Sequence, residues 1–155
     1  MNNWALREVE PTAEDVQLLF DSLSKRNHTI SHRKMPTFEQ HLQFVSNHPY
    51  RKWFLVYFQL EFKGHLYVKY DNAVGLHMSP DVTSSQLGEL WLALTGQIAP
   101  QKVQPSMVPD HFYVNVPTSN LQMQSRLEAA NFVETQRSYR FSLDTREHRA
   151  NRNDK

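Results

Sequence analysis

The sequence predicts a single α/β domain, built on one mixed, mostly antiparallel central sheet that is flanked by about four helices. Two observations support this fold class. Four segments repeat apolar residues at helical spacing, and six short segments alternate in polarity or are rich in aromatic and β-branched residues. A chain of 155 residues is long enough to bury one core. The predicted order is strand, two helices, three strands, helix, strand, helix and strand.

A first strand and a first helix are predicted at the N-terminal end. The strand covers residues 4–9, with Trp4 and Leu6 facing the same side, and Pro11 ends it. Thr12 predicts the helix start because its side chain can cap free amides of the first turn. Residues at helical spacing follow: Val16, Leu19, Phe20 and Leu23.

A second helix is predicted after a polar loop over residues 25–34. Thr37 and Gln40 have the spacing of a capping box, in which each side chain bonds the other residue's backbone amide. Three apolar residues then share one helix face, which we expect to pack on the core: Phe38, Leu42 and Val45.

Three strands are predicted over residues 53–60, 65–70 and 73–78, forming an antiparallel meander. Gly64 is expected to form the first turn and residues 71–72 the second. The first of these strands is dominated by aromatic and branched residues, which is typical of a buried strand.

A third helix and a fifth strand follow. Ser84 or Ser85 is expected to cap the helix, which repeats four residues at helical spacing: Leu87, Leu90, Trp91 and Leu94. Residues 99–109 contain three prolines and predict a loop. Residues 111–116 alternate, which places Tyr113 and Asn115 opposite the apolar set Phe112, Val114 and Val116.

The last predicted elements are a helix and an edge strand. Thr118 or Ser119 is expected to cap the helix, and Asn131 is placed to end it in a left-handed conformation. Residues 137–143 alternate apolar and polar side chains and predict the strand. One helix face is shared by Met123, Leu127 and Ala130.

Composition sets the expected domain limits and excludes several function classes. We expect one domain over residues 1–143 and a polar tail over 144–155. The chain holds 17 basic and 16 acidic residues, and the tail has four and three of these. The body therefore has 13 of each sign, so its charge balance does not indicate a basic surface for nucleic acid. The absence of cysteine excludes disulfides, thiolate zinc sites and a cysteine nucleophile. With no apolar run long enough for a membrane span and no secretion signal, the expected location is cytoplasmic.

One local segment carries a resemblance to a known family. Residues 75–88 read GLHMSPDVTSSQLG. They resemble the GNAT superfamily of N-acetyltransferases, in which an apolar-x-apolar-x-Pro strand end leads into a Gln/Arg-x-x-Gly-x-Gly/Ala loop that opens a helix. Pro80 and Gly88 match the proline and the final glycine. Thr83 stands at the Gln/Arg position, and Gln86 replaces the first glycine.

The order of the predicted elements and a second segment, residues 120–132, extend the resemblance across roughly residues 4–143. Asn120 and Phe132 match an Asn and a Phe of the family's last major helix, while Asn131 replaces the glycine before that Phe. Leu127 stands where the family often has a tyrosine. In addition, HRKMPTFEQHLQFV followed by YRKWFLVYF is similar in style to acetyltransferases that act on amino sugars.

The resemblance implies the GNAT fold and acetyl-CoA as co-substrate. Its pantetheine arm would lie along the strand of Leu76 and Met78, and Asn120 would also contact the cofactor. Its pyrophosphate would bind at a helix N-terminus, where backbone N–H groups and the helix dipole attract anions. The residues of that cradle would be Ser84, Ser85, Gln86, Leu87, Gly88 and Glu89.

Acetyl transfer also requires proton movement off the amine and onto the thiolate. His77 is the candidate base, because its unperturbed pKa lies near ~6.5, and Tyr113 is the candidate acid. For each, an ordinary packing role is the alternative. Leu127 cannot donate a proton, so the common family acid is missing.

The sequence leaves three functions open. The first is an acetyl-CoA-dependent N-acetyltransferase that acts on a primary amine of a small molecule, such as an amino sugar. The second is a catalytically inactive GNAT-like binding module. The third is a protein-binding domain that uses the loop 99–109, with Val103, Met107 and Val108 exposed. No metal site is expected, because His28 and His32 lie in a predicted loop without a third ligand. The resemblance allows a homodimer, since many family members are dimers.

Overall fold

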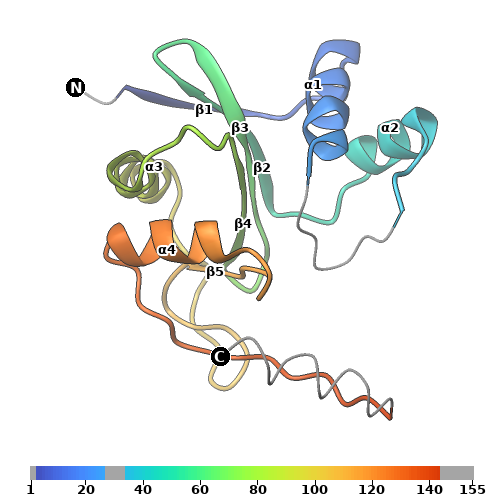
Figure 1. Ribbon diagram of the computed structural model, residues 1–155. Helices are drawn as coiled ribbons and strands as arrows, with labels where there is room; N and C mark the ends of the chain where they lie inside the picture. Colours follow the sequence, from blue (N-terminus) through green and yellow to red (C-terminus); the bar gives the residue numbers. More distant parts are fainter. Residues whose placement is uncertain (1–2, 27–33, 144–155) are drawn as a thin grey trace.

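The computed structural model describes residues 3–26 and 34–143, and it confirms the α/β fold class (Figure 1). Within these residues one sheet has five strands in the order β1-β2-β3-β4-β5, and four helices accompany it. The first four strands pair antiparallel, whereas β5 runs parallel to β4. The strands are β1 (Trp4–Glu8), β2 (Lys52–Phe58), β3 (Glu61–Val68), β4 (Ala73–Met78) and β5 (Tyr113–Val114). The helices are α1 (Ala13–Ser24), α2 (Phe38–Ser46), α3 (Ser84–Gln97) and α4 (Leu121–Ala129).

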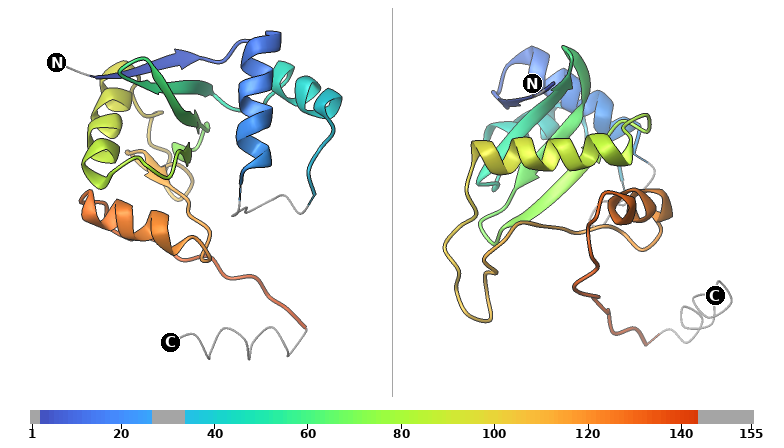
Figure 2. Two further views of the ribbon diagram at one scale, coloured as in Figure 1. Left: turned by 45° about the horizontal axis from the view of Figure 1, so that its top comes forward. Right: turned by 90° about the vertical axis from the view of Figure 1, so that its left-hand side faces the viewer.

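Helices cover both faces of the sheet, so the molecule has two hydrophobic cores (Figure 2). Strand alternation sends Phe54 and Val56 toward α3 and α4, and it sends Trp53 and Leu55 toward α1 and α2. Among the described residues, no helix combines the length and the apolar character that a membrane crossing requires. The predicted tail over residues 144–155 lies outside the described residues, as does most of the loop after α1.

Threonine caps begin three of the helices. Thr12 caps α1 and the Thr37–Gln40 capping box begins α2, as the sequence predicts. For α3 the prediction of Ser84 or Ser85 was wrong, because Thr83 is the cap. The predicted apolar face of α2 was also only partly right. Val45 is buried as predicted, but Phe38 and Leu42 remain 40% and 38% exposed, and His41 is the other buried residue of the helix.

The end of α4 follows the prediction closely. Asn131 has φ +68°, and the amides of Asn131 and Phe132 bond the carbonyls of Glu128 and Leu127, which is the Schellman pattern. Met123 and Leu127 are buried as predicted. The start was predicted wrongly, because Asn120 is the cap in place of Thr118 or Ser119.

The turn between β2 and β3 does not lie at Gly64. Gln59 and Leu60 form it, with φ values of +47° and +70°. Gly64 lies within β3 at φ +136°, next to a register shift at Val56 and Tyr57. A Cβ on Gly64 would come within 2.1 Å of the His77 carbonyl oxygen, so glycine is required there by the close approach of β4.

The loop 99–109 is tied to the sheet by Asn72, in the predicted turn between β3 and β4. Its fully buried side chain donates to the carbonyls of Gln101 and Pro109 and accepts from the Gln101 amide. Within the loop Met107 is 76% exposed, whereas Val108 is buried, contrary to the expectation for the protein-binding alternative.

Two predicted strands are shortened or lost. The strand expected over 111–116 has only two paired residues, and the one expected over 137–143 does not form. Tyr139 and Phe141 are each 86% exposed, and this segment runs away from the sheet (Figure 1). A strand forms only where a neighbouring strand accepts its hydrogen bonds, and alternation alone does not provide that neighbour.

Candidate functional site

The site begins where β4 and β5 separate. The two strands pair only at Ala73 with Tyr113 and at Val74 with Val114. Beyond this point β4 continues to Met78, while the chain after β5 turns through residues 115–117 toward α4. The β4 backbone from Gly75 onward therefore has no strand on its β5 side among the described residues, and a wedge opens there.

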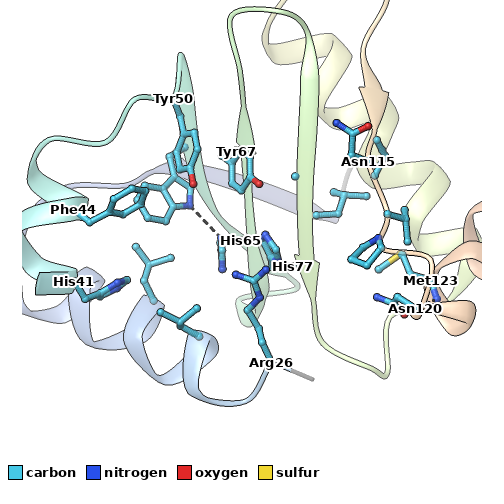
Figure 3. A pocket seen from close by; sticks show the side chains of 18 of the residues that line it. Arg26, His41, Phe44, Tyr50, His65, Tyr67, His77, Asn115, Asn120 and Met123 are labelled. Carbon is cyan, nitrogen blue, oxygen red and sulfur yellow. Dashed lines mark hydrogen bonds between the residues drawn. The ribbon is translucent and has the colours of Figure 1, made fainter. Parts of the chain in front are cut away.

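A cavity of about 370 Å³ occupies this wedge and continues under α1 and α2 (Figure 3). Strand alternation places its floor residues on one face of the sheet. The floor consists of Trp53, His65, Tyr67, Gly75 and His77, whereas Leu76 lines the cavity from the opposite face of β4, where it packs against the core under α3 and α4. The side walls include Leu19, Leu23, Arg26, Gln40, His41, Phe44 and Tyr50 on one side and Val114, Asn115, Val116, Pro117, Asn120 and Met123 on the other.

Stacked tyrosines form one wall of the cavity. The rings of Tyr50 and Tyr67 are parallel within 5°, with centroids 3.9 Å apart. Tyr67 leans over Gly75, where a Cβ would come within 2.2 Å of its Cζ atom. Burial raises the pKa of both tyrosines, so they are neutral at physiological pH. The missing side chain at Gly75 thus makes room for an aromatic wall.

A pair of histidines stands at the centre of the floor. His65 and His77 lie opposite each other on β3 and β4, with ring centroids 4.7 Å apart. Trp53 Nε1 donates to His65 Nδ1 over 3.1 Å. Burial lowers the pKa of His65 well below its ordinary value. His65 is therefore neutral, and this hydrogen bond assigns its proton to Nε2.

Polar groups from the helices face the floor. Arg26 follows α1, and its guanidinium points toward the two histidines (Figure 3). Burial lowers the pKa of Arg26, but a guanidinium remains charged at neutral pH. His41 of α2 also lines the cavity, and burial lowers its pKa. Among the described residues, the cavity lining thus includes one permanent positive charge beside mostly aromatic and neutral groups.

The start of α3 fits a phosphate group only in part. The Thr83 side chain accepts from the Gln86 amide, and the Gln86 side chain accepts from the Thr83 amide. These two residues are the ones that depart from the GNAT pattern, so a capping box replaces the glycine-rich turn. Amides of Ser84 and Ser85 have no intrahelical acceptor. A Cβ on Gly88 would meet nothing within 4 Å, so the cradle retains two donors and open space.

The predicted site residues separate into three groups. Leu76, His77 and Asn120 line the cavity, although the Asn120 side chain also caps α4 by accepting from the Met123 amide. Met78 packs against the α3 and α4 core, and Tyr113 lies outside the cavity, where burial and the Asp71 carboxylate raise its pKa. The first two turns of α3 hold Ser84, Ser85, Gln86, Leu87, Gly88 and Glu89, and of these Leu87 is buried in the core.

No protein-family model and no curated protein sequence matches the chain. A solved structure, that of a possible acetyltransferase from Clostridium difficile 630, is similar over 90% of this chain and 97% of its own, with a TM-score of 0.53 and 11% sequence identity. The chain therefore has an acetyltransferase-like fold. At this identity the likeness concerns the fold alone.

Sequence reasoning missed several residues of the cavity. Arg26 and Tyr50 lie in segments of irregular pattern, and no local signal marks them. His65 and Tyr67 alternate on β3, so they were detectable as one face, but only strand pairing brings them beside His77. For metals, no group of three potential ligands occurs in the part of the chain that the structure describes. His28 and His32 lie outside that part.

Proposed function

We propose that the chain is an acetyl-CoA-dependent N-acetyltransferase that acts on the primary amine of a small molecule. The observation that carries this proposal is the wedge between β4 and β5, which opens into a cavity of about 370 Å³ with His77 on its floor. Along the wedge, β4 from Gly75 to Met78 pairs with no strand on its β5 side among the described residues. An extended acyl-carrying arm has the form to pair with such an edge.

The proposed roles follow from position. The edge of β4 binds the arm, and the amides of Ser84 and Ser85 with the start of the α3 dipole bind phosphate. Acetyl-CoA supplies an activated acyl group as its thioester. Transfer forms a bond between the amine nitrogen and the carbonyl carbon and breaks the carbon–sulfur bond, so the amine loses one proton and the thiolate gains one.

His77 is the proposed acceptor of the amine proton, because it is the histidine that lies on β4 at the wedge. Neutral His65 packs against it and presents Nε2–H on the same face of the sheet. Leu127 is buried and has no proton to give, and Tyr113 lies outside the cavity. We therefore assign protonation of the thiolate to solvent.

Calorimetry with acetyl-CoA tests the proposal. We expect micromolar binding to the wild-type protein and loss of that binding in Gly88→Glu, which places a carboxylate at the phosphate cradle. Gly96→Glu is the matched control, because Gly96 lies in the same helix and is equally open, with nothing within 4 Å of a Cβ. Absence of binding at millimolar acetyl-CoA would overturn the proposal. An acceptor screen that begins with glucosamine then follows.

A catalytically inactive binding module is the second candidate function, and the Thr83–Gln86 capping box favours it. This box uses the Thr83 and Gln86 amides internally, and it fills the turn with a side chain where the family has a glycine. Binding of acetyl-CoA without turnover of any amine would support this second function.

A further inference from the structure

Two buried nitrogen atoms on the helix side of the cavity have no hydrogen-bond partner within residues 3–26 and 34–143: Nε of Arg26 and Nε2 of His41. His41 is only 6% exposed. A buried polar atom without a partner costs about 1–3 kcal/mol, and folded proteins retain few of them. Both residues line the same cavity, so its helix side offers unused hydrogen-bonding groups to a polar ligand.

The charge of the cavity indicates the sign of that group. The described residues that line it include Arg26 but no Asp or Glu. The segment that follows Arg26, residues 27–33, reads NHTISHR and also contains no acidic residue. Within the described part of the chain, this half-buried guanidinium therefore has no carboxylate partner in the cavity lining and is a candidate site for an external anion.

The positions of the polar groups limit the size of the ligand. Arg26, His41, His65 and His77 all line this cavity, and the ring centroids of His65 and His77 lie 4.7 Å apart. Figure 3 shows the guanidinium of Arg26 directed at His65 and His77. An anion at Arg26 and an amine at His77 are therefore close enough to belong to one small molecule.

The helix side of the cavity also has apolar wall residues. Leu19, Leu23, Phe44 and Trp53 surround the helix side of the cavity, next to the stacked tyrosines. A cavity of about 370 Å³ accommodates a compact apolar group together with the amine and the anion.

We propose that the acceptor amine also carries a carboxylate on a small apolar body, as an aromatic or branched amino acid does, and that Arg26 binds the carboxylate. This proposal rests on the proposed function, because it names the acceptor of the same cavity. A guanidinium binds a carboxylate through two parallel N–H donors, which fixes the orientation as well as the charge. Glucosamine has no such anionic group.

The direct test compares L-phenylalanine with phenethylamine, which differ only in the carboxylate. With acetyl-CoA saturating, we expect a lower KM for phenylalanine, and Arg26→Gln should raise that KM by about 10- to 100-fold, as expected for loss of a charged hydrogen bond. The KM for phenethylamine should change far less. Arg26→Lys keeps the charge without the planar fork and should be intermediate. Equal effects on both amines, or none, would overturn the proposal.

Arg137→Gln is the matched control, since Arg137 is an exposed arginine paired with Glu134 and does not line the cavity. It removes the same charge and should leave both KM values unchanged. Alanyl-phenylalanine separates a free amino acid from a peptide terminus, because its amine lies one residue further from the carboxylate. Preference for phenylalanine supports the proposal, and preference for the dipeptide would overturn the free-amino-acid class.

Calorimetry with hydrocinnamate, which has the carboxylate and the ring but no amine, separates this proposal from the proposed function. Binding that Arg26→Gln weakens supports the carboxylate site even if acetyl-CoA does not bind. Acetyl-CoA binding without hydrocinnamate binding would overturn the carboxylate proposal alone. Both titrations use the full chain.

Discussion

Nε1 of Trp53 donates a hydrogen bond to Nδ1 of His65 across 3.1 Å, and both side chains lie buried on the sheet face that α1 and α2 cover. Because Nδ1 accepts this bond, His65 carries its proton on Nε2. Burial is the main reason for its lowered pKa, followed by the charges of His77, Arg26 and His41. The cavity floor thus contains an imidazole with a fixed tautomer and no charge.

Replacing the donor should destabilise the protein. Trp53→Phe keeps an aromatic ring but leaves the buried Nδ1 of His65 without a partner, at an expected loss of about 1–3 kcal/mol in the free energy of unfolding. Urea denaturation at neutral pH measures it. In a His65→Phe background no acceptor is left unsatisfied, so Trp53→Phe should cost less there. Equal costs in both backgrounds would contradict the prediction.

The stability of the protein should fall as the pH drops below about 6.5, the ordinary histidine pKa of the unfolded chain. The folded pKa of His65 is lowered, so the unfolded chain binds the proton first. The contribution of neutral His65 to the free energy of unfolding is complete above the pKa of the unfolded chain and is lost as the pH falls through the pKa of the folded chain. Burial lowers the pKa of His41 and His48 too, which adds to the slope.

His65→Asn tests this pH dependence, because its side-chain oxygen can accept from Trp53 and does not titrate. The slope of unfolding free energy against pH below about 6.5 should become shallower in this variant. A slope identical to that of the wild-type protein would show that His65 does not titrate differently in the folded and unfolded states.

Gly75 should resist substitution although it lies in a regular strand. Gly75→Ala brings a Cβ within 2.2 Å of Tyr67 Cζ, so the ring must leave its stack on Tyr50. We expect a loss of about 1–3 kcal/mol in unfolding free energy, typical of overpacking. The control is Gly96→Ala, where a Cβ meets nothing within 4 Å in helix α3. That change should stabilise the protein by about 0.5–1 kcal/mol. Equal effects at both glycines would refute the steric account.

Placing at position 86 the glycine of the GNAT loop pattern should lower the stability of the protein and raise its affinity for phosphate. Gln86→Gly breaks the capping box with Thr83, at an expected cost of about 1 kcal/mol, and it opens the turn before α3. Gln40→Gly is a matched control, because Thr37 and Gln40 form a capping box with the same two distances, 2.9 Å and 3.2 Å.

ADP is the probe for this experiment, because it carries a pyrophosphate without the acyl arm. Calorimetry should show tighter ADP binding to Gln86→Gly than to the wild-type protein, and no change in Gln40→Gly. An unchanged ADP affinity in Gln86→Gly would show that the capping box does not hinder phosphate binding.

Asn72 should be among the most sensitive polar positions of the fold. Asn72→Ala loses three side-chain hydrogen bonds to Gln101 and Pro109 and places alanine at φ +69°. We expect a loss of about 2–4 kcal/mol in the free energy of unfolding. Asn72→Gly loses the same bonds without the backbone strain, so its loss should be smaller. Denaturation curves that rank the two variants in the opposite order would contradict this account.

Local features of the chain were predictable from residues that are close in sequence. The Thr37–Gln40 box and the left-handed Asn131 depend on backbone groups within one or two turns, so composition and spacing suffice. The capping residue of α3 could not be predicted in the same way. Thr83, Ser84 and Ser85 can all cap a helix, and the packing of α3 selects Thr83 as the start.

The sequence by itself determined the fold class, the meander of β2, β3 and β4, and the apolar faces of α3 and α4, because these depend on periodicity. Tertiary structure alone decided the length of β5 and the loss of the strand over 137–143, because a strand needs a neighbour for its hydrogen bonds. It also decided the cavity. Arg26, His41, His65 and His77 meet there only because strand register and helix packing bring them together, and no spacing along the chain records that meeting.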